Sequence, residues 1–256
     1  MAARQHSAGV HAIDILLRVH ANKVRKLLID SRSTNPRVEA LAQRARELGI
    51  AVQPLRSHKL DDLARGTAHQ GVVAELHGVA PLDEAALRQR VEAALVAGEV
   101  PLMLVLDGVQ DPHNLGACLR SAEAAGAMAV ITPRKSSASL TPAARKVASG
   151  AAESVPVVQV PALAHTLDWL GEYGIQRTAT SDAAQQTLWE ADLVAPQAMV
   201  MGTESKGLAR EVIERCDALV ALPMQGNVES LNVSVAAGIC LFEAVRQRSA
   251  CQSPTT

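Results

Sequence analysis

Short, mostly aliphatic runs alternate with helix-like patterns through the second half of the sequence. Between the runs, apolar residues recur at three- and four-residue spacing, which indicates helices. The predicted strands are 103–107, 129–132, 155–160, 176–180, 198–201 and 219–223, and the predicted helices are 115–125, 142–148, 163–173, 209–216 and a final C-terminal helix. Such alternation is typical of an α/β fold whose mostly parallel sheet is covered by helices on both faces. Ligands of these sheets bind beyond the carboxyl ends of the strands, so functional residues are expected in the turns there.

The last of these turns joins the strand that ends at Pro223 to an apolar C-terminal helix. Residues 230–234 contain Ser and Asn, whose side-chain oxygens can accept from the unpaired N–H groups of a helix start. Gly238 and several alanines then permit another backbone to approach the helix closely. One interpretation is a core helix with an ordinary polar cap. The other is that the turn forms the active site.

A second turn follows the strand MLVLD and has the sequence GVQDPHNLGACLR. The step from Asp111 to Pro112 favours an extended turn, Asn114 can cap the helix that follows, and Gly116 allows close approach. Arg120 lies about one and a half turns further on, and its planar fork of donors suits a phosphate or ribose oxygen. A routine cap and a surface arginine remain the alternative on these residues alone.

A third turn lies in MVMGTESKGL, where Gly202 ends a strand and Glu204 sits in a loop bounded by glycines. The order of residues differs from GxxxxGK[ST], which disfavours a phosphate-binding P-loop. Glu204 is therefore either a functional carboxylate or a solvated loop residue.

The strings DPHNLGACLRSAEAAGA, MVMGTESKGL and ESLNVSVAAGICLFE resemble, in this order, the three signature motifs of the SpoU/TrmH class of RNA 2′-O-ribose methyltransferases. In the second string, Ser205 and Lys206 stand where family members commonly have more glycine. The resemblance implies a C-terminal domain with a deep trefoil knot. General connection rules disfavour knots, so this expectation rests wholly on the resemblance. The likeness is closest to bacterial enzymes that methylate a guanosine ribose in the peptidyl-transferase region of 23S rRNA.

The resemblance also assigns roles to particular residues. The catalytic residues would be Arg120, Asn114, Glu204, Ser230 and Asn232. The methyl donor S-adenosylmethionine would lie where backbone groups near Gly202, Leu222 and Leu231 hold its adenine, with Met224 beside them. The same apolar side chains would equally suit a protein core. We expect Arg120 to orient the target nucleotide, in its own site or that of a partner subunit, because a guanidinium with a pKa above about 12 is a poor general base.

The first 77 residues form a separate α/β pattern with a basic charge balance, since they carry 12 Lys and Arg against 7 Asp and Glu. Helices are predicted at 10–19, 37–48 and 58–63, and strands at 26–29, 52–54 and 72–76. A basic unit joined to a mildly acidic one suggests that the first contacts a polyanion, although chance surface charge is the alternative. GVHAIDILLR, KVRKLLID and AHQGVVAE resemble the accessory domain of the family, which is ribosomal-protein-like and thought to hold RNA. The predicted RNA-binding cations are Arg18, Lys23, Arg25 and Lys26.

The domain division predicted from these patterns has four parts. Residues 1–77 form the substrate RNA-binding domain, 78–100 a linker that contains a helix at 85–97, 101–250 the methyltransferase domain, and 251–256 a C-terminal tail.

Several other classes of protein are disfavoured by the sequence. Four cysteines without CxxC spacing indicate a reducing compartment. No apolar run reaches the 18 or so residues of a membrane span, and the start has no signal-peptide pattern, so we expect a cytoplasmic protein without a membrane partner. Asp107, Asp111 and His113 lack a recognised metal-ligand spacing, so no metal is expected. Aromatic residues make up only 2% of the chain, which disfavours base stacking as the way of holding RNA.

The leading functional hypothesis is thus a homodimeric, S-adenosylmethionine-dependent enzyme that methylates a guanosine ribose of 23S rRNA and has no DNA partner. Ribose methylation of tRNA is the rival within the class, but the N-terminal unit favours rRNA. A non-catalytic RNA-binding or ribosome-assembly factor of the same fold is the alternative outside it.

Overall fold

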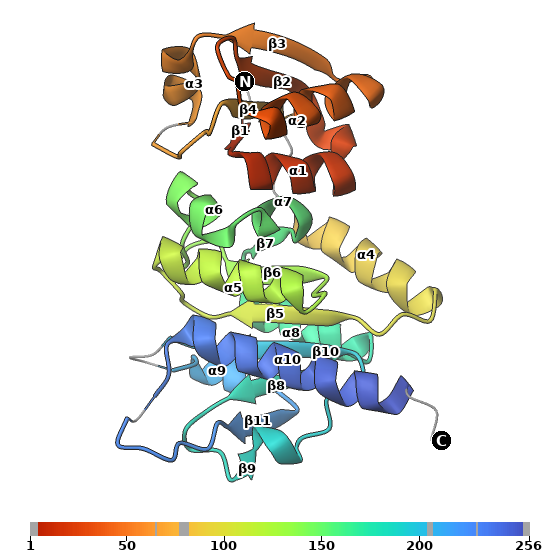
Figure 1. Ribbon diagram of the computed structural model, residues 1–256. Coiled ribbons are helices and arrows are strands. Elements are labelled where there is room, and N and C mark those ends of the chain that lie inside the picture. The colour runs from red at the N-terminus through yellow and green to blue at the C-terminus, as the bar shows by residue number, and fades with distance from the viewer. Residues whose placement is uncertain (1–4, 65, 77–81, 204–206, 229, 253–256) are drawn as a thin grey trace.

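A computed structural model describes residues 5–64, 66–76, 82–203, 207–228 and 230–252. The described chain forms two sheets, one in each half of the sequence, with helices packed around them (Figure 1). No helix in the described ranges combines the length and apolarity needed to cross a membrane.

The N-terminal sheet has four strands in the order β1-β4-β2-β3. Its elements are β1 (Gln5–Ala8), α1 (Val10–Val19), β2 (Val24–Asp30), α2 (Pro36–Glu47), β3 (Ala51–Leu55), α3 (Ser57–Ala64) and β4 (Val72–Leu76), with a 3-10 turn at Ala21–Lys23. Strands β2 and β3 are parallel, whereas β4 runs antiparallel to β1 and β2. The three helices and three strands predicted here are confirmed. The sequence analysis missed β1, because QHSA is short and polar and becomes a strand only by pairing with β4.

The C-terminal sheet has seven strands in the order β7-β6-β5-β10-β8-β11-β9, and every pair in it is parallel. The strands are β5 (Leu102–Leu106), β6 (Ala129–Pro133), β7 (Val157–Val160), β8 (Gln176–Thr180), β9 (Gln186–Thr187), β10 (Gln197–Met201) and β11 (Ala218–Ala221). The predicted parallel α/β sheet is confirmed. Strands β5 and β10 are buried along their whole length, as expected of central strands with helices on both faces.

Alternate residues of β5 divide the core of this half into two layers. Leu104 faces the cluster that contains α5 (Pro112–Ala124) and α10 (Val233–Gln252). Met103 faces the cluster that contains α4 (Glu84–Val96), α8 (Leu163–Glu172) and α9 (Arg210–Ile213). The helix expected in the linker is α4, and its Leu87 and Val91 are fully buried in this second cluster. Helix α10 continues through Gln252, into the predicted tail.

Close backbone contacts set the geometry of α5. A Cβ atom on Gly116 would lie 2.4 Å from the carbonyl oxygen of Ala144 and 2.8 Å from Cβ of Val147, both in α6 (Pro142–Ala148). The predicted close approach at Gly116 is therefore confirmed. The predicted helix end at Ser149 is confirmed too, since this residue has a left-handed φ of 52°. A short helix that the sequence analysis missed, α7 (Ala151–Ser154), follows directly.

Helix α7 also holds the two halves of the protein together, directly below α1 in Figure 1. The Glu153 carboxylate, which is only 6% exposed, accepts a hydrogen bond of 3.1 Å from the Ser7 hydroxyl. It also accepts one of 2.5 Å from the Arg145 guanidinium. Gly150 lies against α1 so closely that a Cβ there would be 2.6 Å from Cδ1 of Ile15. The hydrogen bond from Ser7 to Glu153 and the close contact at Gly150 thus join the N-terminal unit to the C-terminal one, and Arg145 pairs with the same carboxylate from within the C-terminal unit.

We predict that Glu153→Ala lowers the free energy of unfolding by about 3 kcal/mol, because it leaves the guanidinium of Arg145 poorly solvated and without its partner. Urea unfolding measures the loss. The control is Glu92→Ala, which removes a carboxylate from the exposed face of α4 and should change stability little. If Glu153→Ala were as stable as Glu92→Ala, the contacts of Glu153 would not stabilise the protein, which would contradict the prediction.

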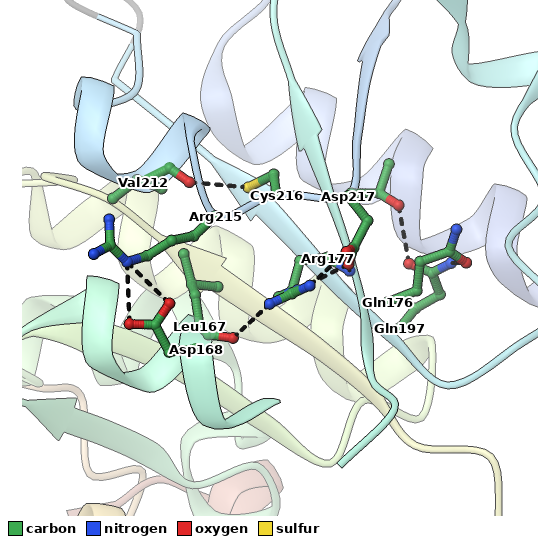
Figure 2. A network of polar contacts seen from close by, with 10 residues as sticks. Leu167, Asp168, Gln176, Arg177, Gln197, Val212, Arg215, Cys216 and Asp217 are labelled. Carbon is green, nitrogen blue, oxygen red and sulfur yellow. Dashed lines mark hydrogen bonds and ion pairs between the residues drawn. The ribbon is translucent and has the colours of Figure 1, made fainter. Parts of the chain in front are cut away.

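A second polar network lies at the amino ends of β8 and β11 (Figure 2). Arg177 donates to the Asp217 carboxylate through its backbone N–H and Nε, at 2.7 and 2.8 Å, and to the Leu167 carbonyl oxygen at 3.0 Å. Arg215 is paired with Asp168 at 3.0 Å. The hydrogen bonds from Arg177 hold the pKa of the Asp217 carboxyl below its usual value. The network therefore ties β8 to the start of β11 and to α8.

Because the folded-state pKa of Asp217 is depressed, its contribution to stability is present above the unfolded pKa of about 4. The contribution is lost as pH falls through the folded pKa. We predict that Asp217→Asn is less stable than the wild type at neutral pH and that the gap closes on acidification. Urea unfolding over a pH series tests this, with Asp168→Asn as the matched variant of the neighbouring pair. A difference in stability between the wild type and Asp217→Asn that does not change with pH would contradict the depressed pKa of Asp217.

Candidate active site

Turns that follow three parallel strands, β8, β10 and β11, meet at the carboxyl edge of the C-terminal sheet and enclose a hollow of about 320 Å³. We call it the leucine hollow, after Leu208, Leu222 and Leu231 in its wall. Its other lining residues are Thr180, Ser181, Asp182, Ala183, Met201, Gly202, Thr203, Gly207, Ile213, Met224, Ser230, Val233 and Ala236. Gly202, Leu222, Met224 and Leu231, predicted for the donor pocket, are thus brought together. Their role toward a donor stays a prediction.

One wall of the leucine hollow is a loop closed upon itself. Thr203 and Gly207 form an antiparallel bridge, with N–H to oxygen distances of 3.1 Å and 2.8 Å. At Gly202, a Cβ atom would lie 2.3 Å from the carbonyl carbon of Gly207 and 2.6 Å from the nitrogen of Leu208. Only glycine fits this position without moving the backbone. Glu204, predicted to be catalytic, lies outside the described residues.

A second hollow of about 500 Å³ lies on the other side of this loop. We call it the asparagine hollow, after Asn114 in its wall. It shares Thr203, Gly207, Leu208 and Val233 with the leucine hollow, and its remaining lining residues are Asp107, Gly108, Val109, Gln110, Ser136 and Ala209. Asp107 anchors the far end of the loop, since its carboxylate accepts a hydrogen bond of 2.9 Å from the Ala209 N–H. The two hollows are therefore separated only by one short segment.

The starts of α5 and α10 are joined by a hydrogen bond between two predicted site residues. Asn232 Oδ1 caps α10 by accepting from the N–H and hydroxyl of Ser234, at 3.0 and 2.6 Å. This fixes the orientation of the amide, so that Asn232 Nδ2 donates to Asn114 Oδ1 at 3.0 Å. Asn114 Oδ1 is thereby used as an acceptor, and its Nδ2 group remains as a donor at the asparagine hollow.

The prediction that Asn114 caps α5 is wrong. The cap is Asp111, whose carboxylate accepts a hydrogen bond of 2.9 Å from the His113 N–H. Pro112 occupies the first helical position, which places the cap one residue before it and leaves Asn114 inside the first turn.

Arg120 lies on α5 but lines neither hollow. Arg120 lies six positions after Asn114 on this helix. This spacing is about 9 Å along the helix axis and points the two side chains about a third of a turn apart around it. The Arg120 side chain is exposed and has no hydrogen-bond or ion-pair partner in the described part of the chain. Ser230 lines the leucine hollow, so one chain brings Ser230, Asn232 and Asn114 together but leaves Arg120 apart from them.

The four predicted RNA-binding cations lie near the beginning of β2, and intramolecular contacts engage them. Arg18 pairs with Asp14 at 3.0 Å and Arg25 with Glu75 at 2.5 Å. Lys26 donates to Gln53 at 3.0 Å. Desolvation by burial lowers the pKa of Lys23. Their role in RNA binding stays a prediction; Arg18 and Arg25 have carboxylate partners, whereas the partner of Lys26 is uncharged.

The polar residues of the two hollows that the sequence analysis missed include Ser181, Asp182, Gln110 and Ser136. Ser181 and Asp182 directly follow β8, and Ser136 lies in the turn after β6. Their position after predicted parallel strands was the only feature of the sequence that could have indicated them. Nothing in their residue types distinguishes them from loop residues.

Among the described residues of this site, neither nucleophilic thiols nor clustered metal ligands are found. Burial raises the pKa of the Cys118 and Cys240 thiols to about 12, so neither is ionised near neutral pH. Within the described ranges no three His, Cys, Asp or Glu side chains lie close enough together to hold a metal ion. The carboxylates of Asp107 and Asp111 instead accept backbone hydrogen bonds.

The fold and the two hollows define a two-part α/β protein with a ligand-sized site at the carboxyl edge of its parallel sheet. Residues 101–242 match the SpoU rRNA Methylase family, and residues 8–82 match the RNA 2′-O ribose methyltransferase substrate binding family. The chain belongs to the SpoU rRNA methylase family, as the three motifs predicted.

Curated relatives extend over nearly the whole chain. The 23S rRNA (guanosine-2′-O-)-methyltransferase RlmB of Pseudomonas syringae pv. tomato is 49% identical over 96% of this chain and 97% of its own. The enzyme of the same name from Haemophilus influenzae is 45% identical over 94% and 96%.

Solved structures share the fold. The SpoU methyltransferase AviRb from Streptomyces viridochromogenes, in complex with AdoMet, has a TM-score of 0.79 at 27% identity and covers 97% of this chain and 92% of its own. A TrmH/SpoU tRNA modifying enzyme from A. aeolicus has a TM-score of 0.55 at 29% identity and covers only 64% of this chain, with 85% of its own.

We predict that Gly202→Ala lowers the free energy of unfolding by about 3 kcal/mol and weakens ligand binding in the leucine hollow, because the added methyl group displaces the loop. Gly226→Ala is the matched control, since a Cβ there meets nothing within 4 Å. Thermal unfolding and calorimetric titration with S-adenosylmethionine measure the two effects. If both variants bind and unfold alike, the close approach at Gly202 does not shape the site.

Proposed function

We propose that this protein transfers a methyl group from S-adenosylmethionine to the ribose 2′-oxygen of a guanosine in 23S rRNA. The observation that supports it most is the pair of adjacent hollows, one with Leu222 and Leu231 in its wall and the other with Gln110 and Asn114. The curated relatives that span the whole chain carry this activity in their names.

The leucine hollow fits the methyl donor in size and chemistry. Its volume of about 320 Å³ lies in the range of small-molecule sites, and apolar side chains alternate there with main-chain groups that can hold a purine edge. Leu222, Met224 and Leu231 would pack against the adenine, and backbone groups near Gly202 would form hydrogen bonds with its polar edge. Asp182 would accept hydrogen bonds from hydroxyl or amino groups of the donor. When bound, S-adenosylmethionine supplies a methyl group on a sulfonium, which is already a good leaving group.

The asparagine hollow would take the target nucleoside. Asn232 holds the Asn114 amide in one orientation, so that Asn114 Nδ2 donates to the ribose or its phosphate across the wall of Thr203 and Gly207. Catalysis then rests on positioning the ribose oxygen toward the donor. Ser230 and Glu204 complete the proposed catalytic set. The 2′-hydroxyl proton would pass to water or to a substrate phosphate oxygen.

Arg120 would act in the site of a second subunit, because one chain keeps it away from both hollows. A homodimer that uses α5 and α10 is supported by Val235 and Phe242, which are 50% and 48% exposed on α10. They are seven residues apart and so share one face of the helix. Covering this apolar face with a second copy would bring the exposed guanidinium of Arg120 to the partner.

We also propose a domain organisation and a cellular localisation for this protein. The RNA-binding domain would comprise residues 1–77, the linker 78–100 and the methyltransferase domain 101–250, with the turns after β10 and β11 forming the trefoil knot. The protein would work in the cytoplasm on ribosomal RNA.

Methylation of tRNA remains the second candidate within the class. The tRNA modifying enzyme from A. aeolicus matches only 64% of this chain, whereas the two rRNA enzymes match 94% or more. The N-terminal unit therefore favours rRNA. A non-catalytic assembly factor is disfavoured by the ordered arrangement of Asn114, Asn232 and Ser230 around the two hollows.

Mapping of ribose methylation tests the proposal directly. Methylated positions in 23S rRNA and tRNA are compared between cells with and without the protein, and the purified enzyme is then added to the unmodified RNA. We expect one guanosine of 23S rRNA to lose its methyl group and to regain it. Loss at a tRNA position alone, or donor binding without transfer to any RNA, would overturn the proposal.

For Arg120 we predict that replacement by Lys, which keeps the charge but loses the planar fork, lowers kcat about a hundredfold. The affinity for S-adenosylmethionine should be unchanged. The control Arg90→Lys makes the same replacement at an exposed position of α4. Near-normal turnover by the Arg120→Lys enzyme would refute the orienting role.

A further inference from the structure

The carboxyl edge of the N-terminal sheet carries cations that no described side chain neutralises. Strands β2 and β3 are parallel and end in register, with Asp30 opposite Leu55. Arg56 directly follows the end of β3, Arg32 lies two residues after the end of β2, and Lys59 lies in the first turn of α3. All three side chains are exposed, and none makes an ion pair or side-chain hydrogen bond with the described part of the chain. Exposed cations of this kind, without an ion-pair partner in the described residues, are available to phosphates.

A second group of cations lies at the carboxyl edge of the C-terminal sheet. Arg134 and Lys135 follow β6 directly, and β6 is parallel to β5, whose end leads into the asparagine hollow. The next residue, Ser136, lines that hollow. Arg134 and Lys135 are exposed and have no side-chain partner in the described ranges. They therefore flank the place proposed for the target nucleoside.

Lys146 lies between these two groups. It is exposed on α6 and lines a cleft of about 480 Å³ where α6 faces the C-terminal end of α3 and the start of α1. Figure 1 shows that β3 and β5 point to the same side of the molecule and that α3, α6 and the start of α10 all lie on this side. The junction at Glu153 holds the two units in this relation.

We propose that the phosphodiester backbone of the substrate RNA crosses this side of the molecule. It runs from Arg32, Arg56 and Lys59, past Lys146, to Arg134 and Lys135 beside the asparagine hollow. The inference rests on the proposed function and names the surface that delivers the RNA. The path uses the edge of the N-terminal sheet opposite to the one that carries Arg18 and Lys26. There the cations already have partners within the protein.

Three double variants with the same change in net charge separate these surfaces. Arg56→Gln/Lys59→Gln removes two cations from the proposed path. Arg18→Gln/Lys26→Gln removes two from the opposite edge. Arg44→Gln/Arg46→Gln is the control at the far end of α2, where both guanidinium groups are ion-paired. Thermal unfolding confirms that each variant folds.

The measurement is the affinity for a transcript of the peptidyl-transferase region of 23S rRNA, as a function of salt and without S-adenosylmethionine. We expect the Arg56/Lys59 variant to bind more weakly, with a slope of log affinity against log salt that is smaller by about two. The other two variants should keep the wild-type slope. Arg134→Gln/Lys135→Gln should also lower the slope by about two while the affinity for S-adenosylmethionine stays unchanged.

Wild-type slopes for the Arg56/Lys59 or the Arg134/Lys135 variant, equal losses in all variants, or a larger loss for Arg18/Lys26 would each overturn the proposed path. This readout needs no methyl transfer. A wild-type protein that binds the transcript but methylates no RNA would therefore count against the proposed function and not against the path.

Discussion

The hydrogen bond between Asn232 and Asn114 is the contact on which the site depends. It joins the first turns of two helices that are 118 residues apart in sequence and that follow different strands of the parallel sheet. The Asn232 side chain caps α10 and cross-links it to α5 at the same time. Because both helices begin at the carboxyl edge, this one contact sets the spacing between the asparagine hollow and the turn after β11.

The close approach at Gly202 complements this contact. The loop after β10 folds back until the backbone of residue 207 leaves no space for a side chain at residue 202. Thr203 and Gly207, at the two ends of this loop, line both hollows, so the hollows are adjacent. The N-terminal unit is attached elsewhere, through the buried Glu153 on α7, and so can hold RNA without occupying the site.

Much of this architecture could be predicted from the sequence, because the second half repeats a strand and helix pattern and the turns behind the strands carry distinctive residues. Leu222 and Leu231, which were predicted for a donor pocket, lie together in the wall of one hollow. Predictions from local sequence pattern failed where the structure depends on a contact outside the pattern. Strand β1 forms only by pairing with β4. Asp111 caps α5 because Pro112 occupies the first helical position. The ion pair of Arg25 with Glu75 joins two strands that are distant in sequence.

The central claim is that the leucine hollow holds the methyl donor and turns its methyl group toward the asparagine hollow. A crystal structure of the protein with S-adenosylmethionine tests this most directly. The account predicts adenine between Leu222 and Leu231, with the methyl carbon facing the wall formed by Thr203 and Gly207, on the side of Asn114. A donor bound outside the leucine hollow, or bound there with its methyl group turned away from Asn114, would contradict the account.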